Sequence, residues 1–433
     1  MSATLAARGA QAADGSPTLQ ALAERVFDDV AAMTGDVRGV SRPAYSDRET
    51  QVLDYLAAVA ADLGLRSWRD DGANLVIAMG EDGGAASACG YIGSHVDSVP
   101  RGGNFDGLAG VAAAMLVLVS LQRAGTRLAS PVRVLALRGE ECAYFGTACI
   151  GSQALLGALD PHVLESQGRG VAQTLGEAMG ETGIDIARIR AGQPLCDAAS
   201  IRFFIEMHIE QGPVLVERGW PIAAVTGIRG NLRHREIQCL GEAGHSGAVP
   251  RWLRRDAVFA ICELVTRMND HWATIQQHGG DLVVTVGMLQ TDAAHHAMSR
   301  IPGEASFSFE ARSQEPATLA AIETLFRSEC QSIERERKVR FVFDDRRYTA
   351  SAQLDTGLIG TMLEACRAEG LPAEAIPSGA GHDAAIFAQA GVPSGMIFVR
   401  NRNGSHNPDE AMDLADFMAG VAVMQRTVEQ LSR

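Results

Sequence analysis

Five side chains that can bind a metal stand at or just after the carboxyl ends of predicted strands. They are His95, Asp106, Glu141, His208 and His406. In a parallel sheet these strand ends meet at one edge, where open α/β sheets bind their ligands. Three imidazoles and two carboxylates suit two divalent metals that share one carboxylate. Two metals about 3.5–4 Å apart bind one hydroxide and polarise a carbonyl, which is the chemistry of hydrolysis.

Two pairs of neighbouring residues add the groups that such a site needs around its ligands. His95 and Asp97 are two residues apart, so on an extended backbone their side chains point the same way. A metal-bound histidine usually needs a carboxylate on its other ring nitrogen to fix its tautomer. Glu140 and Glu141 are adjacent. If a metal lies there, one of them ligates and the other accepts a proton from water.

Each of these residues, taken alone, also has a structural interpretation. Asp106 stands where a helix N-cap is expected, and in isolation we favour the cap. Adjacent acids at a strand end, such as Glu140 and Glu141, are usually solvated loop residues. A lone histidine in a loop is more often a hydrogen-bonded structural residue than a ligand. The shared position of all five at one sheet edge favours the metal site.

The predicted strands and helices place these residues on one α/β domain. Apolar runs predict buried strands at Asn74–Met79, Ala88–Gly93, Pro131–Leu137, Ile201–His208 and Ser394–Arg400. Helical spacing predicts helices at Leu19–Met33, Asp47–Leu65 and Leu108–Ala124. Ser46 and Glu49 form a capping-box pattern before the second helix. Alternating strand and helix predicts a mostly parallel sheet covered on both faces.

The middle of the chain predicts a second domain, inserted into the first. Its strands are expected at Arg233–Leu240, Leu282–Leu289, Ala305–Arg312 and Val339–Phe343, and its helices at Arg255–Asn269 and Pro316–Glu336. The order strand-helix-strand-strand-helix-strand suits a small antiparallel sheet with helices on one face. We therefore expect a discontinuous first domain, residues 1–226 and 346–433, around an inserted domain, residues 227–345.

Composition and charge exclude several classes of protein. The 433 residues are 46% hydrophobic, 21% charged and 5% aromatic, as in a soluble globular protein of two or three domains. A net charge of −14 argues against binding to nucleic acid or to anionic membranes. No run of about 18 apolar residues predicts a membrane span. Lys338 is the only lysine and has no glycine-rich loop beside it, which sets aside Schiff-base and P-loop chemistry.

The cysteines and the N-terminus bear on the compartment. Eight cysteines without a CxxC pair predict reduced, mostly buried thiols in a cytoplasmic protein. Residues 1–17 are rich in Ala, Gly and Ser and lack a continuous apolar core, so they predict a frayed tail rather than a signal peptide.

Six motifs in order resemble the M20 metallopeptidase-related amidases, in particular their hydantoinase/carbamoylase branch. They are GSHVDSVPRGGNFDG, GEECAYFG, MHIEQGP, GEAGHSGAVP, SGAGHDA and GSHNPDE. The branch contains N-carbamoyl-L-amino acid hydrolases, allantoate amidohydrolase, β-ureidopropionase and ureidoglycolate amidohydrolase. The resemblance runs from about Phe27 to Asp416, nearly the whole chain. It implies a di-zinc or di-manganese catalytic domain with an inserted lid and dimerisation domain.

The resemblance also implies a role for each ligand. His95 and His208 would bind one metal, Asp106 would bridge, and Glu141 and His406 would complete the second metal.

Three roles concern catalysis and substrate class. Glu140 resembles the general base, which takes a proton from water and passes it to the leaving nitrogen. Asp97 would orient the first histidine ligand. Peptidase members of the wider family place an acid where this chain has His208. The histidine is the amidase-branch form and favours carbamoyl or ureido substrates over peptides.

Substrate contacts are implied from both domains. Gln211 resembles a contact of the ureido group. His245, in the inserted domain, resembles a residue that stabilises the oxyanion, often from the partner subunit. Arg312 resembles the arginine that holds the substrate carboxylate. From spacing alone we would read His245 as a turn residue and Arg312 as part of a surface salt bridge. Residues that line the site in relatives correspond to Gly381, His382 and Asp383.

Two segments depart from the family pattern. Relatives commonly have His-Ala-Gly-Thr-Thr-Pro-Met where this chain has His245-Ser-Gly-Ala-Val-Pro-Arg251. They commonly have Asn-x-Val-Pro-Gly where this chain has Ser299-Arg-Ile-Pro-Gly303. That asparagine normally contacts the substrate carboxylate, and Ser299 is shorter. The metal core is thus intact while the groups that recognise the carboxylate are altered.

We therefore expect a metal-dependent hydrolase of carbon–nitrogen bonds other than peptide bonds. Its cofactors would be two divalent ions per subunit, Zn²⁺ first and Mn²⁺, Co²⁺ or Ni²⁺ as alternatives. Its substrate would be an N-carbamoyl amino acid or a related ureido acid such as allantoate, ureidoglycolate or N-carbamoyl-β-alanine, with release of ammonia and carbon dioxide. A homodimer through the inserted domain is the expected assembly, with neither nucleic acid nor membrane as a partner.

Two other functions stay open. One is an aminoacylase or dipeptidase of the wider M20 group, which would cleave N-acyl amino acids or dipeptides. The other is a non-catalytic metal-binding or scaffold protein on the same fold. Such proteins tend to lose a ligand or the base, and this chain has all five ligands and Glu140.

Overall fold

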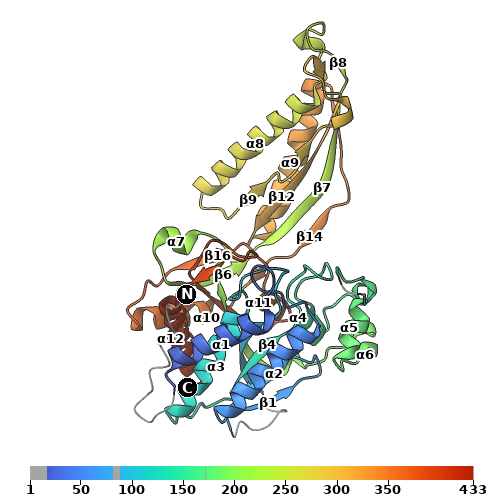
Figure 1. Cartoon of the computed structure of the whole chain (residues 1–433). Helices are drawn as coiled ribbons and strands as arrows, with labels where there is room; N and C mark the ends of the chain where they lie inside the picture. The colour runs from blue at the N-terminus through green and yellow to red at the C-terminus, as the bar shows by residue number, and fades with distance from the viewer. Residues whose placement is uncertain (1–16, 81–87, 171, 433) are drawn as a thin grey trace, which may run out of the picture. The chain divides into compact units, whose positions relative to one another are not determined.

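The structure is a computed structural model that describes residues 17–80, 88–170 and 172–432. Except for Pro17, the predicted N-terminal tail lies outside these residues. The chain divides into two compact units (Figure 1). The first unit is Met1–Thr226 with Gln353–Arg433, and the second is Gly227–Ala352.

Four parallel strands form the centre of the first unit. The sheet runs β1-β2-β4-β3-β5-β17-β6-β15, with β16 beside β6. Strands β4, β3, β5 and β17 are parallel, and the strands on either side of these four are antiparallel to them. All residues of β4 and β17 are buried, as a sheet covered on both faces requires. The strand bounds are Arg66–Arg69 (β1), Leu75–Ala78 (β2), Cys89–His95 (β3), Val132–Leu137 (β4), Ile201–Ile209 (β5), Ile222–Ile228 (β6), Ala352–Gln353 (β15), Ala375–Ser378 (β16) and Ser394–Val399 (β17). A two-stranded ribbon joins Asn401–Arg402 (β18) and Ala411–Met412 (β19).

Helices cover both faces of this sheet, as predicted. The larger helices are Leu19–Thr34 (α1), Asp47–Asp62 (α2), Leu108–Arg123 (α3), Thr356–Ala368 (α10) and Leu414–Leu431 (α12). The shorter helices are Ile150–Leu155 (α4), Leu175–Glu181 (α5), Ile186–Arg190 (α6), Val214–Arg218 (α7) and Asp383–Gln389 (α11). Helix α3 is apolar on nearly every side and is buried from Leu108 to Val119, so it packs inside the core. Ile205 and Met207 of β5 join that core, whereas Phe204 stacks on Phe387 of α11 at 4.0 Å on the opposite face. The alternation along β5 therefore points His208 to the α11 side.

The capping box predicted at α2 is only half formed. The Ser46 hydroxyl accepts the Glu49 N–H at 3.3 Å. The Glu49 carboxylate does not return to the N-cap but accepts from Arg138 Nε at 2.6 Å and from Gly139 N–H at 3.0 Å. The predicted Ser46 N-cap is confirmed, and only the return bond differs: Glu49 accepts the N–H of Tyr45 at 2.8 Å, one residue before the cap. Its carboxylate lies there because buried Arg138 needs a counter-charge.

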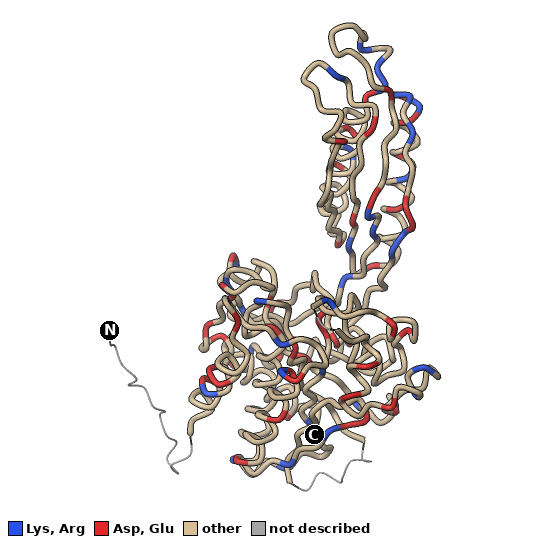
Figure 2. The backbone as a smooth tube through the Cα atoms, turned by 45° about the vertical axis from the view of Figure 1, so that its right-hand side comes forward, with Lys and Arg blue, Asp and Glu red and all other residues tan. Residues whose placement is uncertain are grey.

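The second unit is an antiparallel sheet with two long helices. Its strands are Gly230–Leu240 (β7), Val283–Thr285 (β9), Leu289–Gln290 (β10), Glu304–Ser313 (β12), Arg340–Val342 (β13) and Arg347–Thr349 (β14). Gly244–His245 (β8) and Arg300–Ile301 (β11) form a separate ribbon. Helices Ala257–Gln277 (α8) and Pro316–Arg337 (α9) pack against the sheet around one apolar cluster. Burial alternates along β12, so one face of the sheet is covered. Arginines and acids are interleaved along the unit (Figure 2).

The predicted strand at Leu282–Leu289 is interrupted. Strands β9 and β10 both pair with β12, but no ladder joins the residues between them. Thr285 and Leu289 are four positions apart, whereas their partners Glu310 and Phe307 are three positions apart, so one extra residue between β9 and β10 breaks the regular pairing. Beside the break, the Ser308 N–H donates to the Met288 carbonyl and the Met288 N–H donates to the Ser308 hydroxyl, both at 3.0 Å.

The second unit ends later than the segment predicted for it. Both begin at residue 227, but the compact unit continues to Ala352 because β14 pairs with β7. None of the helices in the described ranges is long and apolar enough to cross a membrane. All eight cysteines are free, and five of them are buried.

Candidate active site

Two groups of ligating side chains meet in the first unit and share Asp106. His95, Asp106 and His208 form one group, and Asp106, Glu141 and His406 form the other. Within each group the ligand atoms lie within 4.8 Å of one another. His95 ends β3 and His208 lies on β5, while Glu141 and His406 follow β4 and β17. The structure therefore brings all five predicted ligands to the carboxyl edge of the parallel strands.

Asp106 faces the two groups with different oxygens. Its Oδ1 lies 3.5 Å from His95 Nε2 and 3.0 Å from His208 Nε2. Its Oδ2 lies 3.5 Å from His406 Nε2 and 3.0 Å from Gln211 Nε2. One carboxylate thus reaches toward both groups, as a bridging ligand does.

The interpretation of Asp106 as an N-cap is wrong. Helix α3 begins after Gly107, which has a φ of 68° and makes no side-chain cap. A Cβ at Gly107 would lie 2.4 Å from His95 Cε1, so the chain needs glycine there to pass the imidazole. The Asp106 side chain is thereby free to face the histidines rather than the helix.

The imidazoles of His95 and His208 turn the same ring nitrogen toward each other. His95 Nδ1 faces the Asp97 carboxylate at 3.3 Å, and His208 Nδ1 faces the Ile209 carbonyl at 2.9 Å. An oxygen acceptor beside Nδ1 keeps the ring proton on that nitrogen. Nε2 is then unprotonated and has a free lone pair. The two Nε2 atoms are 3.4 Å apart. Two lone pairs that converge in a buried site fit a metal ion as their common partner.

The electrostatics of the site favour positive charge. Burial lowers the pKa of His95, but hydrogen bonds to Asp106 and Asp97 outweigh it and hold that pKa well above its usual value. Burial also raises the pKa of Glu141. The Glu141 Oε1 atom is buried, 3.3 Å from His406 Nε2, without an aligned hydrogen bond in the described part of the chain. The carboxylates that favour a proton on the imidazoles would equally favour a divalent cation.

Glu140 is fixed at the end of β4 from two sides. Asp97 accepts the Glu140 N–H with Oδ1 and the Glu141 N–H with Oδ2, both at 2.9 Å. The Cys149 N–H donates to the Glu140 carbonyl at 2.7 Å. Burial raises the pKa of the Glu140 carboxyl well above its usual value, and the charge of Glu141 adds to the effect. A carboxylate with a raised pKa is a better proton acceptor near neutral pH.

Sequence reasoning missed two residues that hold the Asp106 loop. Glu410 accepts the N–H groups of Phe105 at 2.8 Å and Asp106 at 3.2 Å. Arg42, fully buried, donates to the Asn104 side-chain oxygen at 3.0 Å and to the Asp106 carbonyl at 3.5 Å. Glu410 ends the GSHNPDE motif, so a signal for it was present. Arg42 lies in none of the six motifs, so the sequence held no such signal for it.

The SGAGHDA segment lies beside the ligands. The buried imidazole of His382 lies edge-on to the ring of His208, with ring centres 4.5 Å apart, and its Nε2 faces the Ser378 hydroxyl at 3.0 Å. Burial and the charge of His208 hold the pKa of His382 well below its usual value, so its ring stays neutral. Asp383 is bound by the Ser152 hydroxyl at 2.5 Å. Gly381, by contrast, is exposed.

The remaining predicted site residues belong to the second unit. Arg300 pairs with His245 across the β8–β11 ribbon, and the Ser246 N–H donates to the Ser299 carbonyl at 2.8 Å. His245 and Ser299 are therefore neighbours, and both are exposed. Arg312 lies near the other end of β12, opposite Asn231, and pairs with Glu310 at 3.0 Å.

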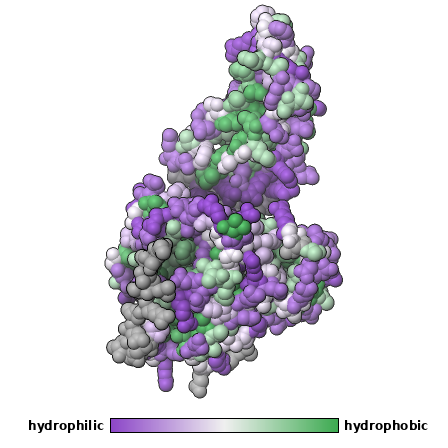
Figure 3. All heavy atoms as spheres, viewed as in Figure 1, coloured by the Kyte–Doolittle hydropathy of each residue, from purple (hydrophilic) through white to green (hydrophobic). Residues whose placement is uncertain are grey.

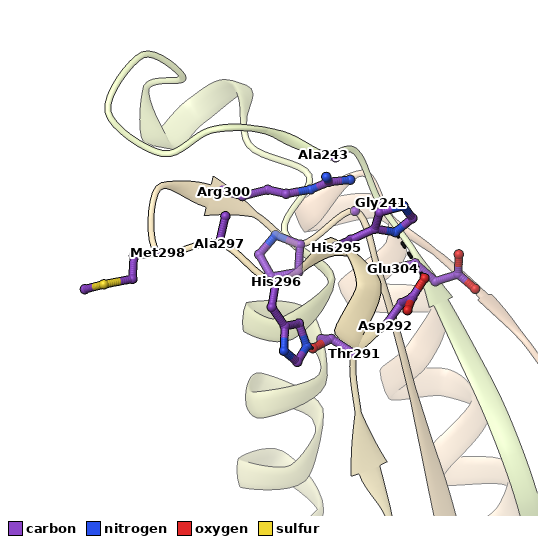
Figure 4. Close-up of a pocket in the computed structure, with 12 residues that line it drawn as sticks. Gly241, Ala243, Thr291, Asp292, His295, His296, Ala297, Met298, Arg300 and Glu304 are labelled. Carbon is purple, nitrogen blue, oxygen red and sulfur yellow. Dashed lines mark hydrogen bonds and ion pairs between the residues drawn. The ribbon is translucent and has the colours of Figure 1, made fainter.

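A pocket of about 720 Å³ opens beside the β8–β11 ribbon (Figure 4). It contains two adjacent histidines that point apart. His295 faces Asp292 at 3.1 Å, and His296 faces the Thr291 hydroxyl at 2.7 Å. Because the rings diverge, this pocket offers no second converging set of imidazoles among its described residues.

Comparisons with known proteins agree with this geometry. A family model described as peptidase family M20/M25/M40 matches residues 91–430. The N-carbamoyl-L-amino acid amidohydrolase of Geobacillus stearothermophilus is 32% identical over 91% of this chain and 94% of its own. The allantoate amidohydrolase of Escherichia coli is 30% identical over 78% and 80%. A hydantoinase/carbamoylase family amidase from Burkholderia multivorans has a crystal structure with a TM-score of 0.84, at 27% identity over 95% and 98% of the two chains.

Proposed function

The chain belongs to peptidase family M20/M25/M40, and we propose that it hydrolyses the ureido or carbamoyl C–N bond of an N-carbamoyl amino acid or a related ureido acid. Ammonia and carbon dioxide would be released. One observation carries the proposal: two ligand groups share Asp106 beside the buried carboxylate of Glu140. The similarity to carbamoyl and allantoate amidohydrolases supports the ureido class of substrate.

We propose two divalent metal ions as cofactors, Zn²⁺ first and Mn²⁺, Co²⁺ or Ni²⁺ as alternatives. His95 and His208 would hold one ion, Glu141 and His406 the other, and Asp106 both. The mixed set of imidazole and carboxylate donors suits each of these metals. When bound, the ions would supply Lewis-acid chemistry, lowering the pKa of water and polarising the substrate carbonyl.

Glu140 would move the proton during hydrolysis. Its carboxylate takes a proton from water as the water oxygen forms a bond to the ureido carbon. The same carboxyl then gives that proton to the departing nitrogen as the C–N bond breaks, which regenerates the base. Asp97 holds the backbone of Glu140 during both transfers. The Gln211 amide, which donates to Asp106 at 3.0 Å, would contact the ureido group.

We further propose that two copies of the chain complete one active site. The family resemblance gives both His245 and Arg312 a contact with the substrate. Arg312 follows Glu304 by eight positions along β12, about 26 Å of strand. The Leu240 partner of Glu304 precedes His245, so His245 lies beyond that end of the strand. Because a ureido acid is much shorter, the two residues could reach it only from different copies.

An apolar face on the second unit supports this dimer. Figure 3 shows hydrophobic side chains gathered over α8 and β9. Met288 and Leu289, which follow β9, are each exposed by 52%. A nearby cavity of about 230 Å³ is lined mostly by apolar side chains, including Trp272 and Val286. Exposed apolar patches of this kind usually mark interaction sites, and we propose a second copy as the partner.

The free cysteines favour the reducing cytoplasm as the compartment.

Ammonia release by metal-loaded protein tests the function. The panel holds N-carbamoyl-L-amino acids, N-carbamoyl-β-alanine, allantoate and ureidoglycolate, with N-acetyl amino acids and dipeptides followed as free amine. We expect turnover of at least one ureido compound, and none by Glu140→Gln. Cleavage of acyl or peptide substrates alone would favour the aminoacylase or dipeptidase. If the protein cleaved no compound of the panel, a non-catalytic role would be favoured.

A further inference from the structure

We propose that Cys149 is a positioning residue whose thiol holds the carboxylate of Glu140 in the orientation for proton transfer. The role depends on the proposed function, because Glu140 acts as a base only in that reaction. Nothing in the sequence motifs pointed to Cys149, which lies after the GEECAYFG segment and outside it.

The thiol and the carboxylate meet in a closed environment. Cys149 Sγ lies 3.4 Å from Glu140 Oε1, within the range of a sulfur hydrogen bond. Cys149 is 5% exposed and Glu140 is 8% exposed. Within the described part of the chain, no other side chain donates a hydrogen bond to the Glu140 carboxylate. The orientation of the base therefore rests on this contact.

The backbone of Cys149 is fixed in an unusual conformation. Its φ of 53° and ψ of 38° are left-handed, a region that residues with a Cβ rarely enter. Two backbone bonds hold it there: Cys149 N–H to the Glu140 carbonyl at 2.7 Å, and Ile150 N–H to the Gly139 carbonyl at 2.8 Å. Glycine would adopt this conformation at lower cost. A strained residue with a side chain, in contact with the base, points to a role for the side chain.

The chemistry of a thiol suits this role. Burial raises the pKa of Cys149 well above its usual value, and the charge of Glu140 adds to the effect, so the group stays protonated and can donate. A thiol is a weak donor. It can orient the carboxylate while competing little with water for the oxygen lone pairs that accept the proton.

Three substitutions separate the thiol from the backbone. Cys149→Ala removes the donor, Cys149→Gly removes it and relieves the left-handed backbone, and Cys149→Ser keeps a donor. With a ureido substrate from the panel, we expect Cys149→Ala and Cys149→Gly to lower kcat about five- to tenfold, because general-base catalysis depends on orientation. KM should stay within about twofold, and the bound metal should be unchanged. Cys149→Ser should recover kcat to within about twofold of the wild type.

The control is Cys366→Ala, another buried cysteine of the same unit, which should leave kcat unchanged. Wild-type kcat in both Cys149→Ala and Cys149→Gly would overturn the proposal. So would a Cys149→Ser variant as slow as Cys149→Ala, because a hydroxyl can make the same contact.

Infrared spectroscopy tests the contact without turnover. The difference between wild type and Cys149→Ala isolates the S–H stretching band of Cys149. We expect that band at lower frequency than in a Glu140→Ala background, where its acceptor is absent. Equal frequencies would refute the hydrogen bond. If the wild type turned over no compound of the panel, the proposed function would fail, and with it the catalytic role of Cys149. The infrared result would still decide the contact itself.

Discussion

Asp97 Oδ2 accepts the backbone N–H of Glu141 at 2.9 Å. The other oxygen of the same carboxylate accepts the Glu140 N–H and lies 3.3 Å from His95 Nδ1. One buried side chain after β3 thus orients the histidine ligand and fixes the end of β4, where the proposed base and a second ligand stand. Charge-assisted hydrogen bonds of this kind are about twice as strong as neutral ones.

Asp97→Asn should therefore weaken metal binding as well as catalysis. The asparagine amide keeps one oxygen as an acceptor. Its NH₂ group would face the backbone N–H of either Glu140 or Glu141, so one of those two hydrogen bonds is lost. We expect metal affinity to fall roughly 10- to 100-fold, the usual effect of losing such a partner. Competition with a chelator measures it, with exposed Asp62→Asn as the matched control. Unchanged affinity in Asp97→Asn would show that the backbone holds the ligands without this carboxylate.

Neighbouring glutamates should respond differently to the same substitution. Glu140→Gln should keep two bound metals per chain and lose at least about 100-fold in kcat, because it removes only the base. Glu141→Gln should lower the bound metal toward one per chain, because it removes a ligand of one group. Metal analysis beside ammonia release separates the two. Loss of metal in Glu140→Gln would move this residue from base to ligand.

Mixed dimers should recover activity if each site takes His245 from the other copy. Glu140→Gln and His245→Ala, each inactive alone, are co-expressed with different tags. A heterodimer would then hold one site with both wild-type residues, and about half of the wild-type kcat per dimer is expected. Absence of recovery in a purified heterodimer would mean that His245 acts within its own copy.

Gly110 should tolerate no side chain. A Cβ there would lie 2.0 Å from the Met207 carbonyl oxygen, because α3 packs directly on β5. Gly110→Ala must push α3 away from the strand that carries His208. We expect a loss of about 1–3 kcal/mol in unfolding free energy, as for other overpacked cores, together with weaker metal binding.

A second helical glycine provides the comparison. At Gly180, in α5, the nearest atom to an added Cβ is 3.6 Å away. Gly180→Ala should raise the melting temperature slightly, since alanine favours helix by about 1 kcal/mol. Equal melting temperatures for Gly110→Ala and wild type would contradict the close packing of α3.

The metal ligands could be predicted because the buried strands that precede them are easy to recognise in the sequence. Buried parallel strands are continuous apolar runs, and the polar residues that follow them gather at one edge. His95, His208 and Glu141 could be placed in this way. The local interpretation of Asp106 failed because a helix start seemed to need a cap, whereas Gly107 begins α3 without one.

The contacts that hold the site were harder to predict because they join distant segments. Glu49 is 90 residues from Gly139, whose N–H it accepts, and Glu410 is 304 residues from Asp106. Cys149 reaches Glu140 across nine residues, but only through a left-handed backbone. No local pattern encodes such pairs, because tertiary packing selects the partner of each buried charge.

The chain leaves the first unit through β6 and re-enters it through β15, its neighbour in the sheet. Adjacent strands lie about 4.8 Å apart, so the two crossings are close enough to be bridged by a short turn. An ancestral version of the first unit could have gained the intervening 126 residues, Gly227–Ala352, between these two neighbouring strands without rethreading its sheet. The same pair of crossings offers protein engineers a place to exchange one insert for another while they keep the sheet that carries the ligands.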